Sequence, residues 1–308
     1  MSQDFLQRNH QNNANSNSST IQQKKLDMQA QLDWLNNQKV DQGFGVFGNS
    51  DSQTTQLKSP EEKKKEFQSK TYSQKNFSPS TGIGLFDVSL NPVSGRLEIK
   101  VNVNFNFVNG LPTSFVGKKG QSEKWDKKEI EKWKNDFISL IEGRWGGKYH
   151  FINTSIPGVT SYVDVEIEEV TKDWHYQLNV TKIPKGSWKG SSIAHYTDSS
   201  KKALKQKNKH FGTLDSEDLS FANKGAKEKQ KGAIHEFGHM IGLGDEYADG
   251  KTGISHAAMV KTALGTVLKE GISNDIMSAG DSIEKQHYIT FLEALQKITS
   301  DKDWKYKP

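Results

Sequence analysis

The chain has 308 residues, a formal net charge of +5 and no cysteine. The lack of cysteine excludes disulfides, thiolate nucleophiles and thiolate-bound zinc, so that a zinc site has to be built from His, Asp or Glu. Lysine is spread along the chain, which favours an ordinary lysine-rich surface over a nucleic-acid site, and no apolar run approaches the ~20 residues that span a membrane.

Residues 1–80 are rich in Gln, Asn, Ser and Lys, and their few apolar residues are scattered. Such a segment cannot bury enough surface to offset its ordering entropy, so we expect a low-complexity, flexible tail. Ile21, Met28, Leu32 and Leu35 lie roughly on one helical face, which permits a short helix within the tail. The first residues lack the basic start and apolar stretch of a secretory signal.

An ordered domain is expected over residues 81–308. Apolar residues alternate strictly with Glu, Lys and Asn from Leu97 to Phe107, which is the period of a half-buried strand. A turn is expected at residues 91–95, so residues 85–90 are the predicted hairpin partner. Asp126 and Glu129 have the spacing of a capping box, and apolar residues at helical spacing predict a helix over 126–142 that ends near Gly143.

The second half of the chain is expected to continue with strands and then with helices. The predicted strands cover 148–152, 161–170, 175–183 and 191–197, and a polar loop follows at 198–209. The predicted helices cover 227–243, 256–269 and 283–298. This order of elements indicates an α+β fold.

Two histidines in the first of these helices have the spacing of metal ligands. His235 and His239 are four residues apart, so that they lie on one helix face and can reach one metal ion at ~2.0–2.1 Å. Glu236 is rotated by roughly 100° from His235, where it can act as the general base without binding the metal. Gly232 and Gly238 each cost the helix about 1 kcal/mol, and close packing of the helix on the sheet would account for them.

The residues after the helix extend this pattern. Gly242 permits the left-handed conformation with which a helix often ends. Asp245 then offers a carboxylate oxygen as a third ligand. Glu246 is an alternative third ligand, and His256 is a further candidate.

The run from His235 to Asp245 resembles the HExxHxxGxxH motif of the metzincin metallopeptidases, in the variant that has Asp in the last place. Residues 273–278 resemble the Met-turn of that family. The resemblance implies that His235, His239 and Asp245 bind Zn²⁺ and that Glu236 is the catalytic base. It also implies a metzincin-like fold, with a mixed twisted sheet, an active-site helix, the Met-turn and a C-terminal helix at 283–298.

Two further positions bear on this resemblance. Met277 matches the methionine that lies beneath the metal as an apolar floor. Some family members carry a tyrosine two residues after that methionine, but this chain has Ala279 there. Tyr247 and Tyr288 are other candidates for an assisting tyrosine.

The expected function is therefore that of a zinc-dependent endopeptidase acting on a protein or peptide, with the substrate added as a strand along residues 191–197. A gluzincin-like enzyme that uses Glu246 would keep the chemistry and change the fold. A non-catalytic zinc-binding or interaction module is the alternative from another functional class. The composition of the tail is similar to that of leaders on cargo of bacterial secretion and injection systems, which suggests a secreted effector or toxin delivered by a non-classical route; otherwise the protein is expected in the cytoplasm.

Overall fold

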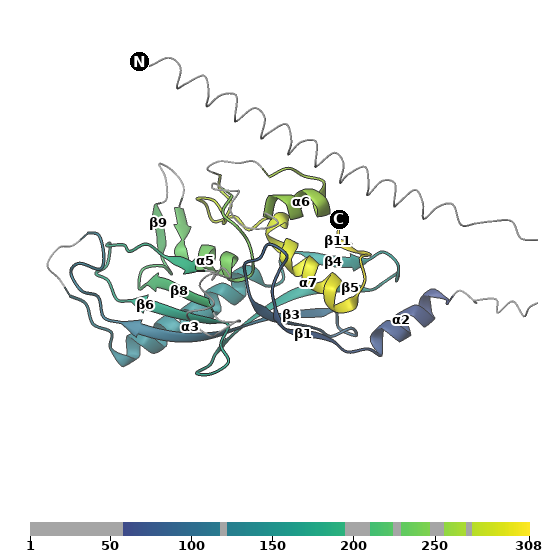
Figure 1. Ribbon diagram of the computed structural model, residues 1–308, viewed down its shortest axis with the longest axis horizontal. Coiled ribbons are helices and arrows are strands. Elements are labelled where there is room, and N and C mark those ends of the chain that lie inside the picture. Colours follow the sequence, from purple (N-terminus) through teal and green to yellow (C-terminus); the bar gives the residue numbers. More distant parts are fainter. Residues whose placement is uncertain (1–57, 118–121, 195–209, 224–228, 247–255, 269–272) are drawn as a thin grey trace, which may run out of the picture. The chain divides into compact units, whose positions relative to one another are not determined.

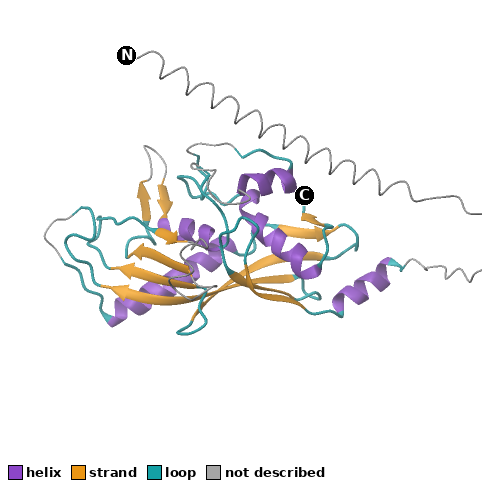
Figure 2. Ribbon diagram, viewed as in Figure 1, coloured by secondary structure: helices purple, strands orange, loops and turns teal. Residues whose placement is uncertain are grey.

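The computed structural model describes residues 58–117, 122–194, 210–223, 229–246, 256–268 and 273–308 (Figure 1). The expected helix near residues 21–35 and the expected loop at 198–209 lie outside these ranges. The described part of the chain is a mixed α+β domain (Figure 2). None of its helices combines the length and the apolar character that a membrane crossing requires.

The strands of the described residues form one nine-stranded mixed sheet and a separate two-stranded hairpin. The strands of the large sheet are β1 (Tyr72–Phe77), β2 (Phe86–Leu90), β3 (Arg96–Val108), β4 (His150–Asn153), β5 (Thr160–Glu169), β6 (Tyr176–Thr181), β7 (Ser192–Ala194), β8 (His210–Asp215) and β11 (Trp304–Tyr306). Their order is β11-β4-β5-β3-β6-β8-β7, and β1 and β2 lie beside β3 off this path. The hairpin consists of β9 (Phe221–Asn223) and β10 (Lys229–Lys231).

The long strand β3 organises the sheet. One of its edges pairs with the parallel strand β5. Its other edge pairs with the antiparallel strand β2 in its first half and with the parallel strand β6 in its second half. His175 lies directly before β6, next to the point where the partner of β3 changes from β2 to β6. Its Nδ1 accepts a hydrogen bond from the backbone N of Asn102 at 3.0 Å, which leaves Nε2 to donate to Asp87 at 3.1 Å. This buried histidine therefore joins two strands that pair with β3 in opposite directions.

One face of the sheet carries the core. Leu97, Ile99, Val101 and Val103 are fully buried, whereas the residues between them are partly exposed. The helices of the domain are α2 (Pro60–Gln68), α3 (Lys127–Trp145), α5 (Gly232–Met240), α6 (His256–Leu264) and α7 (Ile289–Thr299), and one turn of 3₁₀ helix precedes α7 at Lys285–Tyr288.

Ring contacts show which helices cover this face. Phe105 of β3 packs edge-on against Phe137 of α3, with ring centroids 5.5 Å apart, and Phe86 of β2 packs edge-on against Phe291 of α7 at 6.2 Å. Tyr176 of β6 donates its hydroxyl to the carbonyl of Met240 in α5 at 2.9 Å. The three helices therefore share the apolar face, and the domain has two layers.

Most of the predicted elements are confirmed, with shifts at their ends. The hairpin of β2 and β3 and the Asp126 capping box of α3 are present. However, α3 runs through the exposed Gly143 to Trp145, since burying the Trp145 ring outweighs the low helix propensity of glycine. Helix α5 begins at Gly232 rather than near 227, because Lys229–Lys231 pair with β9 instead. The last predicted helix begins as a 3₁₀ turn.

The start of the ordered domain differs from the prediction. The composition predicts a flexible tail up to residue 80, but residues 58–80 contain α2 and β1. Ser59 and Glu62 make a reciprocal capping box at the start of α2, and Phe67 stacks on Tyr72 with both rings buried. Because helix, turn and strand follow one another within about 20 residues, no single hydrophobic period marks this segment.

Candidate metal centre

The helix α5 is held in place at its C-terminal end. The carbonyl of its last residue, Met240, accepts from the backbone N of Leu85 at 3.0 Å and from the hydroxyl of Tyr176. Gly242 then has a φ of +97°, the left-handed conformation expected from the sequence. The backbone of Gly84 lies directly against Gly242, so that a side chain at either position would collide with the other segment. The turn after α5 is therefore fixed by the strand region before β2.

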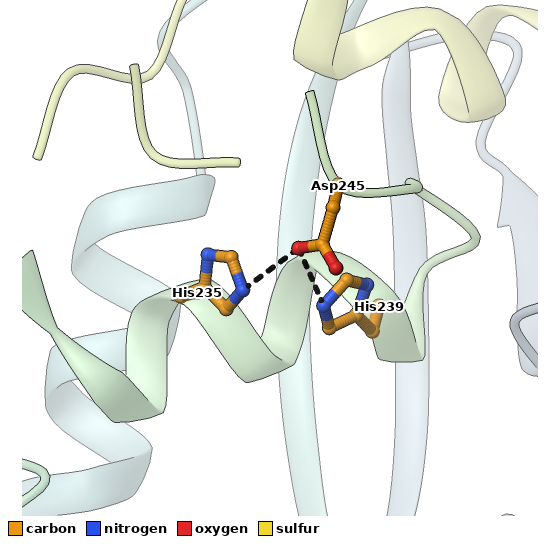
Figure 3. A group of neighbouring side chains, drawn as sticks. All are labelled: His235, His239 and Asp245. Atoms are coloured by element: carbon orange, nitrogen blue, oxygen red, sulfur yellow. Dashed lines mark ion pairs between the residues drawn. The ribbon is translucent and has the colours of Figure 1, made fainter. Parts of the chain in front are cut away.

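This turn brings Asp245 back to the two histidines. Asp245 Oδ1 lies 3.2 Å from His235 Nε2 and 3.4 Å from His239 Nε2, and the two rings are perpendicular with their centroids 4.9 Å apart (Figure 3). Among the described residues, these three form the one group of His, Asp and Glu side chains close enough to hold a metal ion together. Two ligand atoms ~2.0–2.1 Å from a tetrahedral zinc ion lie about 3.4 Å from each other. The separations of 3.2 Å and 3.4 Å agree with this value.

The other nitrogen of each ring determines which tautomer is present. Nδ1 of His235 lies 2.7 Å from the carbonyl of Ile276, and Nδ1 of His239 lies 2.8 Å from the carbonyl of Leu243. A carbonyl can only accept, so each Nδ1 carries a proton, and the lone pair of either ring in its neutral form lies at Nε2. With both rings neutral, two Nε2 lone pairs and the Asp245 oxygen thus converge on one point. Three acceptors in this arrangement are a ligand set for a cation.

The pKa values of Asp245 and His239 reflect the contact between these two side chains. Burial opposes ionisation of Asp245, but hydrogen bonds with His235 and His239 hold its pKa well below the usual range. Burial also lowers the pKa of His239, yet the hydrogen bond with Asp245 and the charge of Glu236 raise it above its ordinary value. Both shifts favour a proton between His239 Nε2 and Asp245, at the point where a metal ion would take the place of that proton.

Glu236 lies beside the group without joining it. The residue is 6% exposed, and its charge contributes to raising the pKa of His239 and of Asp218. The carboxylate is therefore near the histidine pair, as expected for a residue one position along the helix from His235.

Met277 lies against the helix between the two histidines. A Cβ atom at Gly238 would be 2.1 Å from Sδ of Met277, and Met277 is fully buried. The expectation that Gly232 and Gly238 serve helix-on-sheet packing is wrong. Gly238 makes room for Met277, and Gly232 makes room for the carboxylate of Asp218.

The alternative ligands have other partners. Glu246 is turned to His287, whose Nε2 donates to Oε1 at 3.0 Å because the backbone N of Glu284 occupies its Nδ1. His256 Nε2 donates to the carbonyl of Gln286 at 3.2 Å. Tyr288 is buried and donates its hydroxyl to the carbonyl of Trp145, whereas Tyr247 lies outside the described residues.

Sequence reasoning missed the residues that support this centre. Gln230 is 1% exposed and donates to carbonyls of residues 276–280, which we call the Met277 turn. His287 holds Glu246, and Asp218 accepts from Ser191 at 2.6 Å. Gln230 stands between two lysines, a context typical of an exposed strand, so no local signal marked it.

The strand predicted at 191–197 is described only as β7, which lies at an edge of the sheet, and residues 195–197 fall outside the described ranges. Within the described residues, β7 is the last strand in the order and pairs with β8 alone, antiparallel to it. Ser192 and Ala194 are exposed, and Ile193 points into the core. Ser191, just before β7, bonds to Asp218, and the backbone carbonyl of Asp218 accepts from Ala233 in the first turn of α5. This chain of bonds connects the edge strand with the helix that bears the histidines.

Comparison of the chain with protein-family models, with curated proteins and with solved structures found no match. The function therefore has to be inferred from the residues of this centre.

Proposed function

We propose that this protein is a zinc-dependent endopeptidase of metzincin type. The observation that carries the proposal is the convergence of His235 Nε2, His239 Nε2 and Asp245 Oδ1 at 3.2–3.4 Å, with both Nδ1 atoms already donating to carbonyls. Three protein ligands leave a fourth position for water or substrate, which is typical of catalytic zinc sites.

The donor set alone is compatible with two classes of metal. Two imidazoles and one carboxylate suit zinc, and they also occur in non-haem iron oxygenases. Glu236 distinguishes the two, because a buried carboxylate next to the ligands serves as a general base in hydrolysis. The i, i+4 spacing of the histidines with the Glu after the first is the arrangement of zinc peptidases. Zinc is therefore the metal that we propose.

Each residue of the centre then has a role in peptide hydrolysis. A zinc ion bound by the three ligands would polarise the scissile carbonyl and lower the pKa of a water molecule to about 7. Glu236 takes the proton from the attacking water and delivers it to the amine nitrogen that leaves when the C–N bond breaks. The Nδ1 bonds of His235 and His239 hold their Nε2 atoms toward the proposed ion, and Met277 packs against Gly238 between them in the helix.

The proposed substrate is an extended segment of a protein or peptide. An edge strand such as β7 can pair with an extended chain through backbone hydrogen bonds, whatever the side chains of that chain. The bonds from Ser191 to Asp218 and from Asp218 to Ala233 would align such a segment with the metal centre. Pairing along the backbone suits an enzyme that cleaves within chains rather than at their ends.

Three features support the metzincin type in particular. Gly242 has a positive φ after the helix, Asp245 lies beside both histidines, and Met277 packs against Gly238 between them in the helix. The α+β domain with a helix, α7, after the Met277 turn is compatible with that fold.

Glu236→Gln tests the proposal. The variant keeps the shape of the side chain and loses the base, so zinc content should equal that of the wild type while casein cleavage falls by about 10²–10⁴-fold. Zinc is measured by elemental analysis, which also distinguishes zinc from iron. Glu131→Gln, on the exposed surface of α3, is the matched control and should cleave casein at the wild-type rate.

Two results would contradict the proposal. Wild-type protein that binds zinc but cleaves no member of a broad peptide library would favour a non-catalytic zinc-binding module. Glu236→Gln protein that cleaves as fast as the wild type would remove Glu236 from the mechanism.

A further inference from the structure

Gln230 occupies an unusual place for an amide side chain. It lies in β10, directly before α5, and is 1% exposed although it stands between two lysines. Its Nε2 donates to three carbonyl oxygens, those of Ile276 at 2.7 Å, Ser278 at 3.1 Å and Gly280 at 3.1 Å. One amide group thus donates hydrogen bonds to carbonyls on both sides of Met277.

These three carbonyls could not meet without a donor. Their oxygens are all acceptors, and an amide nitrogen offers two hydrogens for them to share. A buried carbonyl that loses its donor costs about 1–3 kcal/mol. The backbone of residues 276–280 can therefore close around this point only while a donor stands there.

The same turn orients a proposed metal ligand. The carbonyl of Ile276 accepts from Nδ1 of His235 at 2.7 Å as well as from Gln230. The Gln230 nitrogen lies 3.3 Å from Nδ1 of His235, and since both nitrogens carry hydrogens they converge on the carbonyl rather than bond to each other. The carbonyl is thus held by Gln230 in the position that keeps the proton on Nδ1 and the lone pair on Nε2.

We propose that Gln230 is a positioning residue of the metal centre, which holds the Met277 turn in the shape that orients His235. This inference rests on the metal-binding function proposed above. It goes further in assigning to an amide outside the ligand set a direct influence on metal affinity. Partners that hold a ligating histidine from outside typically account for 10–100-fold in metal affinity.

Gln230→Met tests this role, because methionine has a similar length and donates no hydrogen bond. Zinc affinity of the purified full chain is measured by competition with a chelator, and thermal unfolding of the metal-free protein is measured in parallel. We expect zinc to bind 10–100-fold more weakly. The absorption spectrum of the protein loaded with Co²⁺, which reports ligand geometry, should change as well.

Asn153→Leu is the matched control. Asn153 is also a buried amide at the centre of a turn, since its Oδ1 accepts from the backbone N of Ser155 and Ile156 and its Nδ2 donates to Asp301. It lies in β4, among residues that take no part in the metal centre. This variant should lose stability while its zinc affinity and its Co²⁺ spectrum stay as in the wild type.

The outcomes separate this inference from the proposed function. If Gln230→Met binds zinc within about twofold of the wild type and only unfolds earlier, as Asn153→Leu does, then Gln230 is a structural residue and the inference is wrong. If the wild type binds no zinc, the proposed function itself fails. If Gln230→Met does not fold without metal, Gln230→Asn replaces it in the same measurements. The asparagine side chain is one methylene shorter, so its amide cannot reach the three carbonyls.

Discussion

Asp245 and Glu246 are adjacent carboxylates with different partners. Asp245 faces His235 and His239, whereas Glu246 accepts from His287 and its backbone N donates to the carbonyl of Met277. Burial lowers the pKa of His287 to about 4, so this ring is neutral and donates to Glu246 as an ordinary hydrogen bond. Glu246 thereby anchors the turn that presents Asp245, and the two residues have separate roles.

Substitutions at these two positions should have different effects on zinc binding. Asp245→Ala removes a proposed ligand, so zinc affinity should fall by more than about 100-fold, the upper end of what outer partners contribute. Glu246→Gln keeps an acceptor for His287 and should bind zinc within about tenfold of the wild type. Chelator competition measures both affinities, and the reverse order of the two variants would show that Glu246 is the third ligand.

At the scale of elements, the Met277 turn packs against α5 because the helix has a glycine, Gly238, at the point of contact. Gly238 stands in the middle of the helix, where glycine costs about 1 kcal/mol relative to alanine. The sulfur of Met277 occupies the space that a Cβ atom would take. Packing of the turn against the helix therefore outweighs helix propensity at this position.

Gly238→Ala should consequently destabilise the protein, although alanine is the better helix former. Overpacking a buried contact costs about 1–3 kcal/mol, which exceeds the propensity gain, and chemical denaturation measures the difference. In the double variant Gly238→Ala with Met277→Ala the two costs should be less than additive, because the new methyl group fills part of the cavity left by methionine.

Gly143→Ala is the control for this prediction. Gly143 lies within α3, and a Cβ atom there would meet no atom within 4 Å. The substitution should stabilise the protein by about 0.5–1 kcal/mol. If Gly238→Ala stabilised it equally, Met277 would not be packed against the helix as the structure shows.

At the scale of the whole molecule, Asp218 connects the sheet edge with the helix of the metal centre. Its carboxylate accepts from Ser191 beside β7 and from the backbone N of Asp215 at the end of β8. Its backbone carbonyl accepts from Ala233 in α5. Burial, the charge of Asp215 and the charge of Glu236 raise the pKa of Asp218 to about 7.

This raised pKa makes the stability of the metal-free protein depend on pH. An unfolded chain releases the aspartate proton near pH 3.9, whereas the folded state retains it to about pH 7. The unfolded state therefore binds fewer protons between these values, and the stability that Asp218 contributes below pH 4 is lost as the pH rises to about 7. Asp218→Asn should flatten this part of the pH profile of the unfolding midpoint.

The control for the pH profile is Asp136→Asn, at an exposed position of α3. This variant should follow the wild type at every pH, because an exposed ion pair contributes little. If Asp218→Asn had the same pH profile of the unfolding midpoint as the wild type, Asp218 would be ionised in the folded protein between about pH 4 and pH 7.

Much of this domain was predictable from local patterns. The alternation from Leu97 to Phe107 predicted β3, and the spacing of Asp126 and Glu129 predicted the start of α3. Both are signals carried by neighbouring residues, because a strand alternates with period two and a capping box closes over three residues. The spacing of His235 and His239 likewise determined that the two rings share a helix face.

Only the tertiary structure decided what surrounds the histidines. Gln230 meets the Met277 turn across 46 residues, and His287 meets Glu246 across 41. Gly238 is required by a sulfur atom from another segment rather than by the sheet. Contacts between distant segments depend on how the whole chain packs, and they leave no period or spacing in the sequence. The chain's own residues thus determined which groups could bind a metal, while the packing of distant segments decided their orientation and their hydrogen-bond partners, and it brought Asp245 rather than Glu246 to the two histidines.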